Sequence, residues 1–261
     1  IADTEEDGLL LLRRELSHST FLRALHSKRQ LQEVMVDFWA NHFNVFLYDT
    51  AYEHLQVADN RTVARAHALG RFADLLSASA HSPAMLVYLN NARSNANSAD
   101  GVNENYGREV MQLFSIGLVE RNQDFSPVLD GSGQTVPTYD SAVVAAMSRV
   151  FTGWTYAGQT DANYGRVDGR SYAPMECHPA YHDDQPKAIF RGIVIANGND
   201  CAATLERALD ALSQHPNTAP FISRQLIQRF VTSNPSPGYI PRAGQAWSTS
   251  GGDIGRVLRA I

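Results

Sequence analysis

Apolar residues recur at steps of three and four along much of the chain, which is the spacing of one face of an α-helix. The first such stretch, Leu22–Val45, is predicted to form one continuous helix. Its buried face is expected to carry Leu31, Met35, Phe38 and Trp39. The same spacing predicts a second helix over Asn60–Ala78.

Capping residues mark the next elements along the chain. Ser82-Pro83 can open a short helix, with serine as the N-cap and proline in the first turn. A loop rich in small residues, Ala92–Val102, leads to Asn103, which is expected to cap a helix that ends before Gly117. The polar segment Arg121–Thr138 contains Gly and Pro and is predicted to be a loop or a hairpin.

Helical spacing returns in the second half of the chain, on both sides of an irregular segment. The predicted helices are Asp140–Thr152, Ala202–Ser213, Ala219–Val231 and Asp253–Ile261. Between Gly153 and Asp200 only Ala188–Ala196 resembles a strand. We therefore predict a mainly α fold, with one multi-helix globular domain over residues 1–261. Residues 153–200 are predicted to form an irregular insertion or lid with at most a small β element.

Composition removes several classes of function. The chain of 261 residues has a net charge of −5 and no basic run, which argues against nucleic acid as a partner. No apolar stretch is long enough to span a membrane. Motifs of serine hydrolases, P-loop proteins and Rossmann folds are absent from the sequence. The two cysteines, Cys177 and Cys201, would form a disulfide in an exported protein, or remain thiols or weak metal ligands in the cytosol.

The densest polar motif is Asn103–Glu109. Glu104 and Arg108 are four residues apart, so they lie on one face of the predicted helix. Gly107 inside this helix would cost about 1 kcal/mol relative to alanine, which suggests the close approach of a bulky group. The motif is either an exposed ion pair beside a cap or a substrate-holding helix start. We expect the Glu104–Arg108 pair to be partly buried.

Histidines and a tryptophan supply the other candidate chemistry. His42 follows Trp39 by one helical turn, and it is either a core histidine or a general base or metal ligand. The run Cys177–Asp184 holds His182 and Asp183 and gives the best metal or acid/base signal in the chain, although a solvated loop is the alternative. Trp154 is a platform for a ring-shaped ligand or a packing anchor.

These motifs together resemble the bacterial family catalogued as domain of unknown function 1800. The resemblance rests on Arg29–Leu31, Phe38–Val45, Ser82–Leu86, Asn103–Glu109, Phe151–Trp154, His182-Asp183 and His215–Phe221, in that order. It implies an extracytoplasmic protein, and hence a Cys177–Cys201 disulfide. It also implies a protein that continues beyond both ends of this chain. Members of the family are often encoded beside members of another family, domain of unknown function 1501, which is therefore a candidate co-exported partner. It implies no established reaction.

Two hypotheses follow for the function. The leading one is acid/base or metal-assisted hydrolysis of a cell-surface polymer, with a divalent metal as a candidate cofactor. The alternative is a non-catalytic component of the cell envelope, which self-associates or assists assembly. For the first hypothesis, the expected catalytic residues are His42, Glu104, Arg108, Glu109, His182 and Asp183, with Asn41, Asn103, Tyr106 and Trp154 as substrate-binding residues. We expect His42, the Asn103–Glu109 helix start and His182-Asp183 to converge on one site.

Overall fold

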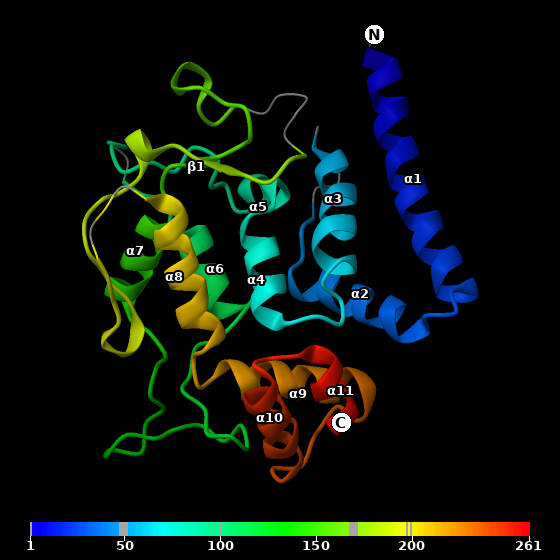
Figure 1. The fold of residues 1–261 in the computed structure, drawn as a ribbon, viewed down its shortest axis with the longest axis vertical. Helices are drawn as coiled ribbons and strands as arrows, with labels where there is room; N and C mark the ends of the chain where they lie inside the picture. The colour runs from blue at the N-terminus through cyan, green and yellow to red at the C-terminus, as the bar shows by residue number, and fades with distance from the viewer. Residues whose placement is uncertain (1, 47–51, 100, 167–171, 197, 199) are drawn as a thin grey trace.

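The computed structural model describes residues 2–46, 52–99, 101–166, 172–196, 198 and 200–261. Helices dominate this part of the chain, and the named strands form two small antiparallel pairs (Figure 1). The predicted mainly α fold is therefore confirmed. The helices are α1 Ala2–His26, α2 Gln30–His42, α3 Glu53–Asp59 with a π-helical turn over Asn60–Arg65, α4 Phe72–Ala80, α5 Pro83–Tyr88, α6 Asn105–Gln112, α7 Ser141–Val150, α8 Cys201–Ser213, α9 Thr218–Phe230, α10 Tyr239–Ser250 and α11 Ile254–Ala260.

The predicted continuous helix over Leu22–Val45 is wrong, because the chain breaks between α1 and α2. The backbone N–H of Arg29 donates to Ser27 Oγ at 3.1 Å. The Gln30 side-chain amide donates to the carbonyls of Ala24 and Ser27 at 3.0 and 2.9 Å. The Gln30 bonds satisfy carbonyls at and just after the end of α1, and the Ser27 hydroxyl takes a backbone N–H, so both side chains compete with continuation of the helix.

The apolar face predicted for this segment survives in α2 with one correction. Met35 and Trp39 are fully buried, and Phe38 is partly buried against the core. Leu31, which was expected to be buried, is 48% exposed. It lies in the first turn of α2, directly after the break, and lines an open pocket with Leu69, Phe230 and Leu258.

The predicted helix over Asn60–Ala78 is also wrong, because the chain turns before α4. The carbonyl of Gly70 accepts a hydrogen bond from the N–H of Ile254, and the N–H of Phe72 donates to the carbonyl of Gly252, both at 3.0 Å. The backbone on either side of Arg71 thus pairs with the start of α11. A contact so distant in sequence overrides the local helical spacing.

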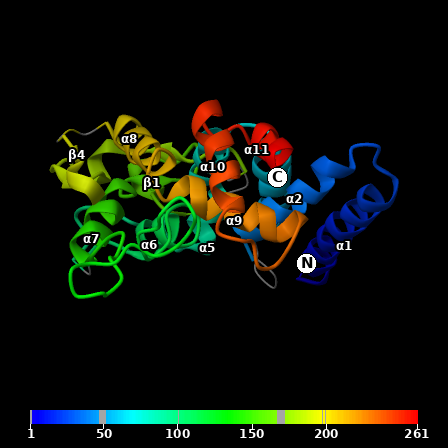
Figure 2. The same cartoon turned by 90° about the horizontal axis from the view of Figure 1, so that it is seen from below.

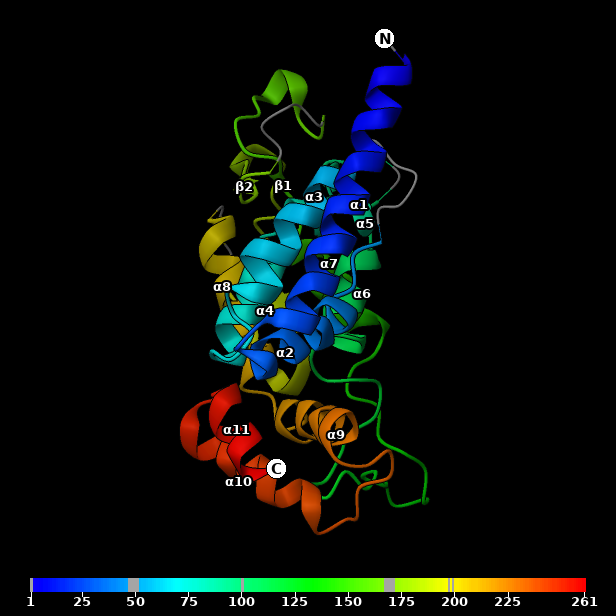
Figure 3. The same cartoon turned by 90° about the vertical axis from the view of Figure 1, so that its right-hand side faces the viewer.

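The C-terminal helices form a small group at one end of the molecule (Figures 1 and 3). Both α9 and α11 pack against α10. Helix α10 was not predicted, although its buried residues, Ile240, Ala243, Gly244 and Trp247, have helical spacing. Two of these four are small, so the apolar signal is weak. Asp253, by contrast, caps α11 by accepting a hydrogen bond from Arg256 N.

The described residues between 153 and 200 pack onto the helical body. Strand β1 Trp154–Thr155 pairs with β2 Glu176–Cys177, and β3 Lys187–Ala188 pairs with β4 Val194–Ile195, which lies near α8 (Figure 2). The prediction of one strand over Ala188–Ala196 is therefore wrong. Arg191 and Gly192 have left-handed backbones, with φ of 56° and 73°, and turn the chain back on itself.

The segment Arg121–Thr138 forms a hairpin, which is one of the two alternatives predicted from the sequence. The backbone N–H of Glu120 donates to the carbonyl of Val136 at 2.8 Å. The Asn217 side chain holds the base of the hairpin. It donates to the Val119 carbonyl at 2.8 Å and accepts from the Arg121 N–H at 2.9 Å. The hairpin is thereby attached to the start of α9.

The expected disulfide is present between Cys177 on β2 and Cys201, the first residue of α8. It links the insertion covalently to the body. We expect thiol titration of the unreduced, denatured chain to find no free thiol, and reduction to release two. Detection of two thiols before reduction would remove the disulfide from the fold.

The buried apolar residues form one cluster, from Met35 on α2 to Val257 on α11. The insertion contributes Tyr156, Phe190 and Ile195 to it. No described helix is long and apolar enough to cross a membrane.

Candidate functional site

The start of α6 is more exposed than predicted. Arg108 Nη2 lies 2.8 Å from Glu104 Oε2, and the two side chains are 45% and 47% exposed. The expectation of a partly buried pair is therefore wrong. Asn103 precedes the helix by two residues. It accepts from the Asn105 N–H at 2.9 Å and donates to the Asn90 carbonyl at 2.7 Å. The oxygen and the amide nitrogen of the Asn103 side chain thus both stabilise the entry to α6.

The opposite face of α6 explains Gly107 and Tyr106. A Cβ atom on Gly107 would lie 2.6 Å from the backbone nitrogen of Ser148, so the bulky neighbour inferred from the sequence is α7 itself. Tyr106 is buried, stacks on Phe151 with ring centroids 4.2 Å apart, and donates to the Ala80 carbonyl at 3.0 Å. The Tyr106 side chain is thus a packing group between helices.

Glu109 differs from its neighbours on α6. Its Oε2 is buried and has no hydrogen-bond partner among the described residues, and the same holds for the Tyr139 hydroxyl. Burial raises the pKa of Tyr139, Arg108 opposes this change, and the Glu109 charge adds to it. Glu109 is therefore the member of the motif whose polar group the described fold leaves unsatisfied.

His42 connects three parts of the fold. Its Nε2 lies 2.9 Å from the Phe114 carbonyl, and its Nδ1 lies 3.2 Å from Gln225 Oε1 on α9. Its ring packs edge-on against Trp39. Burial lowers the pKa of His42, although the contacts to Phe114 and Gln225 oppose this change. Both ring nitrogens are engaged, as in the structural alternative. Neighbouring Asn41 is exposed and donates to the Asp37 carbonyl at 2.7 Å.

His182 and Asp183 attach the insertion to the end of α7. His182 Nδ1 lies 2.8 Å from the Thr152 carbonyl, and the Asp183 N–H donates to Thr152 Oγ1 at 2.8 Å. Asp183 Oδ1 lies 3.3 Å from Arg149 Nη1 and 3.4 Å from Lys187 Nζ. Lys187 is fully buried, and burial lowers its pKa. This charge network anchors the loop.

His182 keeps one unsatisfied group. Its Nε2 is buried without a partner in the described part of the chain, and burial lowers the pKa of the imidazole.

Trp154 is 3% exposed and packs edge-on against His81, with ring centroids 5.3 Å apart. Its geometry matches the packing-anchor alternative.

The predicted residues lie in two places. Tyr106 contacts Phe151, and the adjacent Thr152 holds His182, so the start of α6 and the insertion meet at the end of α7. His42 instead contacts Phe114, just beyond the other end of α6. Among the described residues, no hydrogen bond, ion pair or ring contact joins His42 to Glu104 or His182. Their joint catalytic role stays a prediction. In the described part of the chain, no group of three or more His, Cys, Asp or Glu side chains is arranged to hold a metal ion.

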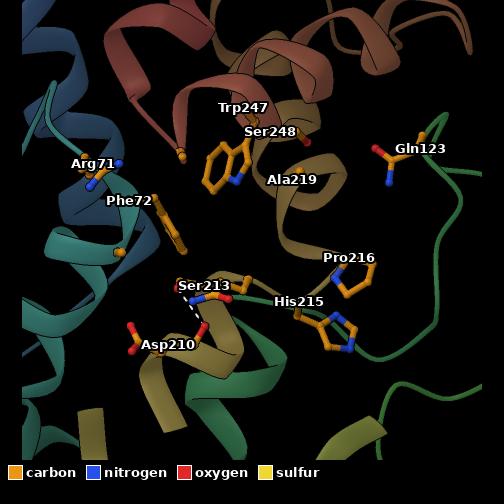
Figure 4. Close-up of a pocket in the computed structure, with 14 residues that line it drawn as sticks. Arg71, Phe72, Gln123, Asp210, Ser213, His215, Pro216, Ala219, Trp247 and Ser248 are labelled. Carbon is orange, nitrogen blue, oxygen red and sulfur yellow. Dashed lines mark hydrogen bonds between the residues drawn. The ribbon is translucent and has the colours of Figure 1, made fainter. Parts of the chain in front are cut away.

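A pocket of about 510 Å³ lies elsewhere, between the start of α4, the α8–α9 connection and the end of α10 (Figure 4). This volume falls within the range of roughly 300–1,000 Å³ that is typical of ligand sites. Its lining residues are Arg71, Phe72, Ala73, Gln123, Asp210, Ser213, Gln214, His215, Pro216, Ala219, Trp247, Ser248, Gly251 and Gly252.

An aromatic wall forms one side of this pocket. The rings of Phe72 and Trp247 are in contact, with centroids 5.2 Å apart, and because Phe72 is fully buried and Trp247 is 6% exposed, only an edge of the indole reaches the pocket. Gly251 and Gly252 follow α10 with φ of 65° and 75°, a left-handed conformation that favours glycine. A Cβ on Gly252 would lie 3.3 Å from the Trp247 ring. The two glycines therefore let the chain pass close beside the indole.

Polar groups surround the aromatic wall. Figure 4 shows Arg71 and Gln123 on opposite sides of the pocket, with Asp210 near its floor. Within the described residues, no hydrogen bond or ion pair occupies the side chains of Arg71, Gln123 or Asp210. The Trp247 indole N–H also has no such partner there, and it is not among the fully buried unsatisfied atoms. These groups are available to a ligand.

His215 lines the pocket, but its ring points away from Trp247 (Figure 4). Its Nδ1 accepts from the Asn217 N–H at 3.1 Å, and its ring packs edge-on against Phe190. Burial, helped by the nearby Arg191 charge, lowers the pKa of His215 to about 4. His215 therefore supports the pocket floor as a neutral ring.

The sequence analysis named the His215–Phe221 motif, which supplies His215, Pro216 and Ala219 to the pocket, but did not predict the pocket, because its lining comes from four separate segments.

Comparison with known proteins adds the family. No curated protein matches the chain, and no solved structure matches it. The model of the family described as "Protein of unknown function (DUF1800)" matches residues 8–261, so the chain belongs to this family.

Proposed function

We propose that the protein binds a saccharide unit of a cell-surface polymer, without cleaving it, in the pocket between α4, α8 and α10. The observation that carries this proposal is the pocket itself. An aromatic wall stands beside a guanidinium, a carboxylate and an amide that have no partner among the described residues.

The chemistry of a sugar fits this lining. A pyranose has an apolar C–H face that packs on an aromatic ring. Its hydroxyl groups both donate and accept hydrogen bonds, so they fit a lining that contains both hydrogen-bond acceptors and hydrogen-bond donors. Trp247 offers the ring and an N–H donor, Asp210 offers acceptors, and Gln123 offers both. A purely apolar ligand would leave these polar groups unsatisfied.

Binding is favoured over hydrolysis because several predicted catalytic residues are engaged in contacts within the fold. Both ring nitrogens of His42 contact Phe114 and Gln225, and Nδ1 of His182 contacts the Thr152 carbonyl. Glu104 and Arg108 form an exposed ion pair, and Asp183 belongs to the network that holds the insertion. Acid/base or metal-assisted hydrolysis stays a prediction.

An extracytoplasmic location is part of this proposal. The Cys177–Cys201 disulfide supports it, because disulfides persist in oxidising compartments. The co-exported partner of the domain of unknown function 1501 family and self-association stay predictions.

Calorimetric titration with a panel of cell-surface oligosaccharides tests the proposal. Ser248 is an exposed residue on the pocket rim, so Ser248→Trp should fill the pocket and weaken binding at least about tenfold. Thr249→Trp is the matched control, because Thr249 is exposed on the same helix and does not line the pocket.

Two results would oppose the proposal. One is a panel in which no saccharide binds the wild-type protein. The other is equal weakening by both tryptophan variants. New reducing ends in the same mixtures would instead favour the predicted hydrolase.

A further inference from the structure

Arg71 stands apart from the arginines that form ion pairs on this protein. Among the described residues, five arginines lie within 4 Å of a carboxylate: Arg65, Arg108, Arg149, Arg191 and Arg229. Arg71 has neither an ion pair nor a side-chain hydrogen bond with any residue in the described ranges. An unpaired guanidinium in a pocket is a ready site for a carboxylate, which it can bind through two parallel hydrogen bonds.

The fold holds the backbone of Arg71 beside the glycine turn, and its side chain is exposed. The backbone on both sides of Arg71 pairs with the chain after α10, through Phe72 N–H to the Gly252 carbonyl and Ile254 N–H to the Gly70 carbonyl. Nη2 of Arg71 lies only 2.7 Å from the position that a Cβ on Gly251 would take. The guanidinium therefore lies over the glycine turn, next to Gly252, which packs beside the Trp247 indole.

The charges of the pocket give a ligand one orientation. Figure 4 shows Arg71 and Asp210 separated by Phe72, and no ion pair joins them. A carboxylate on the ligand is attracted to Arg71 and repelled by Asp210. The sugar hydroxyls can donate to Asp210, because a carboxylate accepts hydrogen bonds only. The acidic group of the ligand thus lies at the Arg71 end of the aromatic wall.

Building on the proposed saccharide binding, we propose that the pocket selects acidic sugars of the uronic-acid type and that Arg71 determines this specificity. The pyranose ring lies over the accessible edge of the Trp247 indole, and its carboxylate pairs with the guanidinium. A neutral sugar fills the same space and leaves the guanidinium unpaired.

A matched pair of ligands tests the inference. The acidic probe is trigalacturonate, and the neutral probe is the same trisaccharide with each carboxyl group reduced to a hydroxymethyl group. By calorimetry, we expect the wild-type protein to bind the acidic probe about tenfold to a hundredfold more tightly than the neutral one. Added salt should reduce this preference.

The variant Arg71→Gln should lose the preference while it retains binding of the neutral probe. Arg71→Lys should keep part of it, because it retains the charge without the planar fork. Arg207→Gln is the control for net charge, since Arg207 is exposed on α8 and does not line the pocket.

The outcomes separate the two proposals. Equal binding of both probes by the wild-type protein would overturn the acidic-sugar inference and leave saccharide binding intact. An acidic preference that survives in Arg71→Gln would do the same. Failure of both probes, together with a saccharide panel that gives no binding, would overturn the proposed function.

Discussion

Replacing Trp39 with alanine is expected to lower the free energy of unfolding by about 3–5 kcal/mol, the usual cost of removing a large core aromatic side chain. Trp39 is fully buried and its ring contacts Phe43 and Phe72. Its indole N–H also donates to the Ala68 carbonyl at 3.0 Å. Truncation therefore leaves a cavity and an unsatisfied carbonyl in one place. Urea unfolding monitored by circular dichroism measures the loss.

Leu31→Ala is the control from the same helix. Leu31 was predicted to share the buried face with Trp39, but it is 48% exposed. Its replacement should change the free energy of unfolding by less than about 0.5–1 kcal/mol. A loss below 1 kcal/mol for Trp39→Ala, or equal losses for the two variants, would show that α2 does not anchor the core through Trp39.

This contrast shows which features local spacing could predict. The recurrence of apolar residues located α2 and its buried Met35 and Trp39 correctly. It could not predict the break before Gln30, because side chains of Ser27 and Gln30 there take over hydrogen bonds of the backbone. Nor could it predict the turn at Gly70, whose carbonyl pairs with Ile254 far away in the sequence.

The candidate site shows the same limit more strongly. Sequence motifs gather polar residues that are adjacent along the chain, and many of these residues hold the fold together here. His42 joins α2 to α9, and Asp183 holds the insertion on α7. The available polar groups of the pocket, on Arg71, Gln123 and Asp210, come from distant segments. Only the packing of those segments brings them together.

A buried carboxyl group leads to the second prediction, which concerns pH. Asp59, at the end of α3, is 8% exposed, and its Oδ1 accepts a hydrogen bond from Ser82 Oγ at 2.6 Å. Burial raises the pKa of Asp59 from its ordinary value of 3.8 to about 6, although the Ser82 bond opposes this change. Charge on Asp59 also helps to raise the pKa of the buried Tyr106, beyond the effect of burial.

The sign of the effect follows from linkage. Because the pKa of Asp59 is higher in the folded state, the folded chain binds this proton more tightly than the unfolded chain does. The resulting stability is complete below pH 3.8 and is lost as the pH rises through about 6. One pKa unit corresponds to about 1.4 kcal/mol, so the difference between 3.8 and about 6 corresponds to about 3 kcal/mol.

Asp59→Asn removes this titration and keeps the size of the side chain. We expect the free energy of unfolding of the wild type, relative to Asp59→Asn, to fall by about 3 kcal/mol between about pH 4 and pH 7. Other titrating groups are common to both proteins and cancel in the difference. Asp74→Asn, which removes an exposed carboxylate from α4, controls for net charge.

Ser82→Ala separates burial from hydrogen bonding. The Ser82 hydroxyl stabilises the charged form of Asp59, so its removal should raise the folded-state pKa and move the upper end of the pH-dependent loss above about 6. Parallel pH profiles for the wild type and Asp59→Asn would contradict the burial of a titrating carboxyl group. An upper end unchanged by Ser82→Ala would instead remove the hydrogen bond as a cause. Burial alone would then set the pKa, because the cost of charging a carboxyl group away from water does not depend on Ser82.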